Sequence, residues 1–229
     1  MDVWKKHVQR NWNVFDTYSV RLRLDNVVGG KPASAKMIEK WVDATNDKKS
    51  EEERNKIKEA HMDTLPDLTE DKATKQSCVF SRYKGQLCLE GRQVKALLKE
   101  CGNIIKTVVP GSKKGELDKV ARLKSKIAEQ VFVMEDYIPL GRTEPDETTE
   151  RPIHVMTAQG PRTSIKRTEV VKDVEIEFTM KRRKGRGKDA VPEKVLMAVL
   201  DYGQLNGLGA DRSIGMGTFK VLSVEKLEE

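Results

Sequence analysis

Five glycines stand between positions 203 and 217 in a run that also holds Arg212 and Ser213. Glycine tolerates positive φ and lets the backbone approach another surface closely. In such a run, successive amide groups can face one anion, while an arginine and a hydroxyl add hydrogen bonds to phosphate oxygens. The pattern predicts a phosphate-binding loop. The alternative is a flexible turn that closes a domain.

Three further groups of basic residues suggest the same kind of ligand. The first lies in the opening turn of a predicted helix, where cations of the same chain are unfavourable and an external anion is indicated. The second lies on a polar stretch over 159–168, and the third in a run over 181–188 with six basic residues in eight. Their alternative is a solvated surface. The candidates are Arg92 and Lys95 in the first group, Arg162, Lys166 and Arg167 in the second, and Lys181, Arg182 and Arg183 in the third.

Side chains suited to catalysis are few. Asp43 and Asp47 stand at the end of a predicted helix, and His61 is one of three histidines, with His7 and His154. A histidine can act as general base toward an RNA 2′-hydroxyl, but none of these has a serine or tyrosine beside it in sequence. Asp43, Asp47 and His61 are therefore the catalytic candidates, while the pattern favours a protein without an active site, metal ion or cofactor. The GxxxxGK[ST] and HExxH patterns are absent from the sequence.

The composition indicates which kind of partner and which cellular compartment to expect. Among 229 residues, 34% are charged and the net charge is +7, which favours an acidic partner, most simply nucleic acid. The three cysteines are odd in number and lack metal-ligand spacing, which indicates reduced thiols inside a cell. Because no apolar run approaches the roughly 20 residues that span a bilayer, we predict a cytoplasmic protein without a membrane partner.

The elements that must position these residues follow from hydrophobic periodicity. Apolar and polar residues alternate over 18–24 and again over 174–180, which predicts two half-buried strands. Gly29-Gly30 ends the first. Helices are predicted from near Gly91 and from Pro192, and a last strand over 219–224 follows the glycine-rich run.

Shorter sequence patterns predict the elements that lie between these strands and helices. Ser34 can cap one helix and a solvated helix is predicted over 50–61. A hairpin is predicted around Tyr83-Lys84-Gly85. Apolar residues at helical spacing predict a helix over 117–127, and the acidic segment 141–151 is predicted to be a loop.

Without two insertions, at about 29–90 and 103–150, the order is strand, helix, strand, strand, helix, strand. This order is typical of an α+β, ferredoxin-like domain with an antiparallel sheet, the arrangement of the RNA recognition motif. We therefore expect a single domain over 1–229 with these insertions and a projecting arm at about 157–173.

The chain resembles the RAMP superfamily of CRISPR-associated proteins, whose hallmark is a glycine-rich loop between the last helix and the last strand of such a domain. The segment 207–219 fits that hallmark in spacing and position. The run Leu89-Glu-Gly91-Arg-Gln-Val-Lys95-Ala-Leu97-Leu is similar to the segment that leads into the first helix of RAMP backbone subunits, and Gly29-Gly30 stands where these proteins end their first strand.

The resemblance implies a non-catalytic RNA-binding subunit that assembles with copies of itself or related subunits around a guide RNA, with the target strand as a further ligand. The residues implied are the loop glycines with Arg212 and Ser213, the glycine amides holding phosphates. The arm would insert between nucleotides or grip the next subunit. The glycines are Gly207, Gly209, Gly215 and Gly217.

Two alternatives remain open. One is an endoribonuclease of the same superfamily, either metal-dependent or histidine-dependent. Asp43 and Asp47 depart from the family pattern, in which the aspartate lies in an extended loop after the first strand. The other is a structural protein whose basic arms contact acidic proteins and no nucleic acid.

Overall fold

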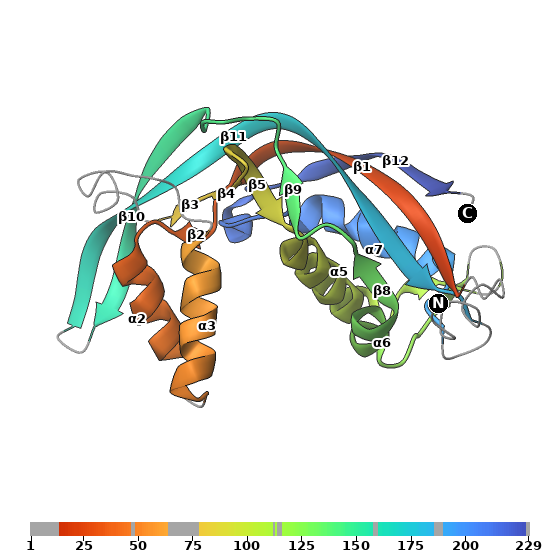
Figure 1. The fold of residues 1–229 in the computed structure, drawn as a ribbon. Helices are drawn as coiled ribbons and strands as arrows, with labels where there is room; N and C mark the ends of the chain where they lie inside the picture. Colours follow the sequence, from red (N-terminus) through yellow and green to blue (C-terminus); the bar gives the residue numbers. More distant parts are fainter. Residues whose placement is uncertain are drawn as a thin grey trace, which may run out of the picture.

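The protein is seen in a computed structural model, which describes most of the chain. The described residues are 14–46, 49–63, 78–111, 113, 116–157, 160–185 and 190–227. They form a mixed α+β protein with helices against one face of a curved sheet (Figure 1).

Three long strands make the main sheet. β1 (Phe15–Val28) lies between β12 (Phe219–Leu227) and β11 (Gly160–Arg183), and it is antiparallel to both. Alternate residues of β1 and β11 are buried, as predicted, because one face of the sheet is covered by helices.

The other edge of β11 is shared by three strands. β8 (Val131–Val133) pairs antiparallel with the end of β11, and β10 (Glu147–Thr157) pairs with its beginning to form a long hairpin. β3 (Cys78–Val79) pairs with β11 in parallel at Thr168. One continuous strand therefore joins the helix-covered sheet to the projecting hairpin (Figure 1).

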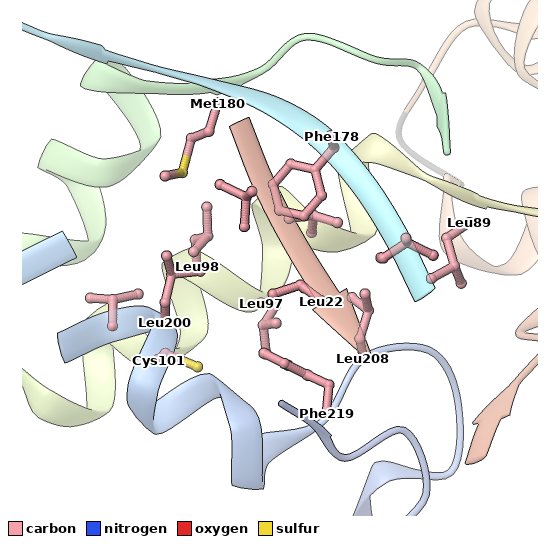
Figure 2. Close-up of a cluster of buried hydrophobic side chains, with 14 of the residues drawn as sticks. Leu22, Leu89, Leu97, Leu98, Cys101, Phe178, Met180, Leu200, Leu208 and Phe219 are labelled. Carbon is pink, nitrogen blue, oxygen red and sulfur yellow. The ribbon is translucent and has the colours of Figure 1, made fainter. Parts of the chain in front are cut away.

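The main core lies between the sheet and three helices. These are α5 (Gly91–Ile105), α6 (Leu123–Gln130) and α7 (Glu193–Asn206). Figure 2 shows Phe178 of β11 directed toward Leu97 and Leu98 of α5, and all three side chains are buried. The helices beginning at Gly91 and after Pro192 are confirmed.

A second pair of helices lies under the other end of the arched sheet (Figure 1). α2 (Ala35–Thr45) begins after the N-cap Ser34, and α3 (Glu51–Met62) begins after a capping box at Ser50. None of the α3 side chains is fully buried, so the predicted solvated helix is confirmed. The helix pair is bridged by ion pairs, which are described with the site.

Smaller sheets complete the fold. β4 (Ser81–Tyr83), β5 (Gln86–Glu90) and β9 (Tyr137–Pro139) form an antiparallel sheet that contains the predicted hairpin. β6 (Val109–Pro110) and β7 (Leu117–Asp118) pair with each other in a two-stranded sheet. The two-residue strand β2 (Lys31–Pro32) pairs with β3 and so belongs to the main sheet.

Three sequence interpretations are corrected. The helix predicted over 117–127 is helical only from Leu123, and Leu117 is exposed in β7. The predicted loop over 141–151 becomes β10 from Glu147 onward, because charged cross-strand pairs with β11 stabilise a polar strand. Finally, β8 lies inside the predicted insertion 103–150 yet pairs in the main sheet.

In the part of the chain that the structure describes, no helix has the length and apolar character that a membrane crossing requires.

Candidate functional site

The glycine-rich loop follows α7 and closes against the end of β1. Gly207, Gly209 and Gly217 have φ values of 78°, 95° and 76°. A Cβ on Gly217 would overlap the carbonyl oxygen of Leu208, and one on Gly209 would lie 2.8 Å from that of Val28. These glycines are therefore required for a folded, closely packed loop.

Most of the loop amides that were expected to bind phosphate donate within the chain. The amide of Gly217 donates to Asn26 at 2.5 Å, that of Gly207 to Gly203 at 3.0 Å, and that of Gly215 to Arg212 at 3.0 Å. The predicted role of these three amides as phosphate ligands is corrected: they hold the loop in shape. Gly209 lines a cleft, described below.

The charged residues of the loop also have partners. Arg212 lies in a short 3₁₀ turn and pairs with Glu100 of α5 at 2.9 Å. Asp211 accepts a hydrogen bond from Lys166 at 2.5 Å and lies 3.5 Å from Arg151. The arm is thereby tied to the loop. Ser213 is exposed in the same turn.

A cleft of about 530 Å³ lies where the loop, the segment after β1, the start of α5 and helix α3 meet. It carries three basic side chains and one carboxylate, together with loop backbone. These residues are Lys31, His61, Arg92, Glu90 and Gly209. Segments that are far apart in the sequence thus bring cations together around one open volume.

Burial controls the charges in this cleft. Lys31 is 5% exposed, and burial lowers its pKa to about 8 although Glu90 opposes the change. Burial also lowers the pKa of His61, with Arg92 and Lys31 acting in the same direction. His61 is thus mainly neutral at pH 7, while Lys31 and Arg92 carry positive charge.

Glu90 is held as a carboxylate. Burial raises its pKa, but hydrogen bonds from Arg92 and from Ser81, the latter at 2.6 Å, outweigh this and the pKa is lowered. Glu90 is also the N-cap of α5, where its backbone amide donates to Gln93 at 2.9 Å. The anion at this helix start comes from the chain itself, so Arg92 and Lys95 do not by their position indicate an external anion.

Lys95 belongs to the packing of α5 against α6. Its ammonium donates to the carbonyl of Ile127 at 2.9 Å and lies 5.0 Å from the ring centre of Phe132. Burial lowers its pKa. Lys95 is not among the residues that line the cleft, although Arg92 is.

The basic run over 181–188 is only partly a surface feature. Lys181 to Arg183 continue β11, and Arg182 is 11% exposed in its side chain, where it pairs with Asp16 and donates to the carbonyl of Val191 at 2.8 Å. The interpretation of Arg182 as a solvated RNA ligand is therefore wrong. Arg183 is exposed, and Lys181 is half-buried. Residues 186–189 lie outside the described part.

The arm residues differ from one another. Arg167 pairs with Glu150 across the hairpin at 2.6 Å, and Lys166 pairs with Asp211. Arg162 stands opposite Val155 in the hairpin, but its side chain lies outside the described residues.

Of the catalytic candidates, only His61 lies in the cleft. Asp43 pairs with Lys58 at 2.9 Å and with Arg54 at 3.7 Å, which joins α2 to α3. Asp47 and His7 fall outside the described residues. Among those described, no three His, Cys, Asp or Glu side chains are grouped so that they could hold a metal ion.

Sequence reasoning did not select Lys31. The available signal was its position directly after Gly29-Gly30, where the chain turns at the end of β1. The turn brings Lys31 into the same cleft as Gly209 of the glycine-rich loop.

Comparison with known proteins finds likeness among solved structures but not among sequences. No protein-family model and no curated protein matches the sequence. Among solved structures, the chain is similar to one in the cryo-EM structure of the Type III-B Cmr-beta complex bound to cognate target RNA, with 14% sequence identity and a TM-score of 0.44. The alignment covers 98% of this chain and 64% of that chain. The chain thus spans just under two thirds of the length of that structural neighbour.

Proposed function

We propose that the protein is a non-catalytic RNA-binding subunit of the RAMP type, which assembles with copies of itself or related subunits around a guide RNA. The strand order supports this fold assignment. β12, β1, β11 and β8 are neighbours in that order, with α5 and α7 in the connections. This is the neighbour order that a ferredoxin-like domain requires.

The cleft is the observation that carries the RNA-binding proposal. Lys31 and Arg92 face one volume of about 530 Å³ beside the glycine-rich loop. Their two positive charges exceed the single charge of Glu90, and partial desolvation strengthens their attraction to an anion. A sugar–phosphate backbone offers the regular negative charge that such a cleft can bind with little base preference.

The structural neighbour gives the context in which we place this activity. Its chain belongs to a Cmr complex bound to target RNA. We extend assembly in a ribonucleoprotein to this chain as part of the proposal.

Salt-dependent binding tests the proposal. A fluorescein-labelled oligouridylate is titrated with protein at several salt concentrations, and binding is followed by anisotropy. We expect log affinity to fall steeply and linearly with log salt, and Arg92→Ala to lower the slope by about one. The matched control is Arg21→Ala, since Arg21 lies on the sheet and pairs with Glu175 at 3.0 Å. A flat plot for the wild-type protein contradicts the proposal.

His61 favours RNA cleavage as a second candidate. It lies in the cleft, and its lowered pKa leaves a neutral imidazole that can accept a proton. End-labelled RNA is incubated with the protein, with and without magnesium, and with His61→Ala as the comparison. Cleavage that is lost in the variant supports the nuclease, whereas intact RNA with undiminished binding supports the non-catalytic role.

A further inference from the structure

Two tyrosines stack on the small sheet of β4, β5 and β9, with Tyr83 exposed and Tyr137 half-buried. The ring centres of Tyr83 and Tyr137 are 4.7 Å apart and the rings are inclined by 16°. Tyr83 is 46% exposed, so this stack is not part of the apolar core. The ammonium of Lys84 lies 5.2 Å from the Tyr83 ring centre.

The strand register places this stack beside the cleft. Tyr137 is the partner of Glu90, while Cys88 is the partner of both Ser81 and Pro139. Side chains alternate along a strand, so positions 81 and 83 of β4, 86, 88 and 90 of β5, and 137 and 139 of β9 share one face. Three of these residues line the cleft, namely Ser81, Cys88 and Glu90.

The opposite face of the small sheet is used for packing. Leu87, Leu89 and Ile138 alternate with the cleft-facing positions, and all three are buried in the core. The sheet is thus anchored on one face and presents aromatic rings on the other. Its turn at Lys84-Gly85 has positive φ at both residues, which is typical of a tight hairpin and sets the position of Tyr83.

The electrostatics place Tyr137 close to the same carboxylate. Burial raises its pKa, and Glu90 and Cys88 raise it further. Both groups line the cleft, and Tyr137 is the register partner of Glu90, although neither tyrosine is among the residues that line the cleft itself.

We infer that the Tyr83–Tyr137 pair stacks a nucleobase of an RNA whose phosphates contact Lys31 and Arg92. The inference rests on the proposed function and adds a base-contacting site to a phosphate-contacting one. Because every base has a flat π face, stacking on Tyr83 adds affinity without selecting a sequence. Lys84 stands in an exposed turn with its ammonium over the Tyr83 ring, so its flexible side chain moves aside when a base stacks on that ring.

A cycle of protein and RNA variants tests the inference. A labelled oligouridylate is compared with one of equal length whose central nucleotides lack bases, so that the phosphate charge is unchanged. We expect the wild-type protein to bind the abasic RNA about tenfold more weakly. Tyr83→Leu should bind both RNAs equally, at the level of wild type with abasic RNA.

Tyr83→Phe is the conservative control and should retain the preference for RNA with bases, since it keeps the ring. A second readout uses RNA with a central 2-aminopurine, whose fluorescence should be quenched by the wild-type protein and by Tyr83→Phe but not by Tyr83→Leu. Gln86→Ala, at the register partner of Tyr83, tests for a general effect of altering the hairpin.

The outcomes separate the two proposals. Salt-dependent binding with no difference between the two RNAs overturns the stacking site and leaves the proposed function standing. A loss in Tyr83→Leu that is equal for both RNAs also overturns it, because the tyrosine is then structural. If the wild-type protein binds neither RNA, both proposals fail.

Discussion

Two carboxylates in this protein, Asp16 and Glu90, are each flanked by cations. The two groups differ in whether an open volume lies beside the charges. At the far end of β11, Asp16 pairs with Arg182 and lies 2.8 Å from the ammonium of Lys226. In the cleft, Lys31 and Arg92 flank Glu90 around an open volume. The first group holds its charges in direct ion pairs and supports the fold, with Lys184 as a third cation 3.9 Å from Asp16. The second borders an open volume that a ligand can enter.

The two carboxylates respond alike although their roles differ. Burial raises the pKa of Asp16, but hydrogen bonds from Lys226 and Arg182 outweigh it and the pKa is lowered, as for Glu90. An ionised carboxylate among cations therefore does not identify a binding site. An accessible volume beside the charged groups does.

Breaking the Asp16 group should have the largest effect on stability. Arg182→Ala leaves a buried carboxylate with one fewer partner, and we expect the free energy of unfolding to fall by about 3 kcal/mol. Urea denaturation measures the change. RNA affinity of the folded variant should stay within about twofold of wild type, because Arg182 is an internal partner.

The matched control for Arg182→Ala is Arg183→Ala. Arg183 is exposed on the same strand, and its loss should alter stability by less than about 0.5 kcal/mol. Equal destabilisation by the two variants would remove the distinction between an internal and a solvated arginine.

The loop beside the cleft should respond to a methyl group according to the space at each glycine. Gly217→Ala places a Cβ against the Leu208 carbonyl at a positive φ, and we expect a loss of about 2 kcal/mol or more by urea denaturation. Gly215→Ala meets no atom within 4 Å and should cost only about 1 kcal/mol for its backbone conformation. Similar losses at both positions would indicate that loop packing does not shape the cleft wall.

Removing the buried cation of the cleft should affect binding and not stability. Lys31→Met retains a side chain of similar length without the desolvated ammonium, so the free energy of unfolding should not fall. Oligouridylate affinity should decrease about tenfold, or about 1.4 kcal/mol. An unchanged affinity would place Lys31 with the internal cations, and Arg21→Ala again serves as the distant control.

The smallest effect is expected from pH. The pKa of Lys31 is about 8, so its charge is lost as the pH rises from 7 to 9, and RNA affinity should fall about fivefold. Lys31→Met should show a smaller change. The sign for stability is opposite: the folded pKa lies below the unfolded one, so the unfolded chain binds more protons and unfolding becomes less favourable as the pH rises through this interval. Anisotropy and urea titrations at each pH follow the two quantities.

Local patterns predicted those elements whose burial is simple. The alternation over 18–24 and over 174–180 predicted β1 and β11, because one face of each meets the helices. The cap at Ser34 predicted α2, and the charged stretch over 50–61 predicted α3. The first half of β10 was missed because its stability comes from pairing with distant residues such as Arg167 and not from an apolar face.

The candidate site was predicted in part. Gly209, Arg92 and His61 were singled out from sequence, and all three line the cleft. Lys31 and the pairing of Tyr83 with Tyr137 were not. The sequence around the predicted hairpin does not indicate whether the Tyr83 ring is buried or exposed. The strand register shows which face of the small sheet carries it.

Composition and spacing by themselves determined that this protein is basic, that its main strands alternate in burial, and that a glycine-rich run over 203–217 lies between a helix and the last strand. They also placed the helix caps, which depend on residues only a few positions apart. Tertiary structure decided which cations became internal partners and which face an open cleft. That outcome depends on packing between segments as far apart in sequence as Asp16 and Lys226, and on the desolvation and pairing that each charge meets there.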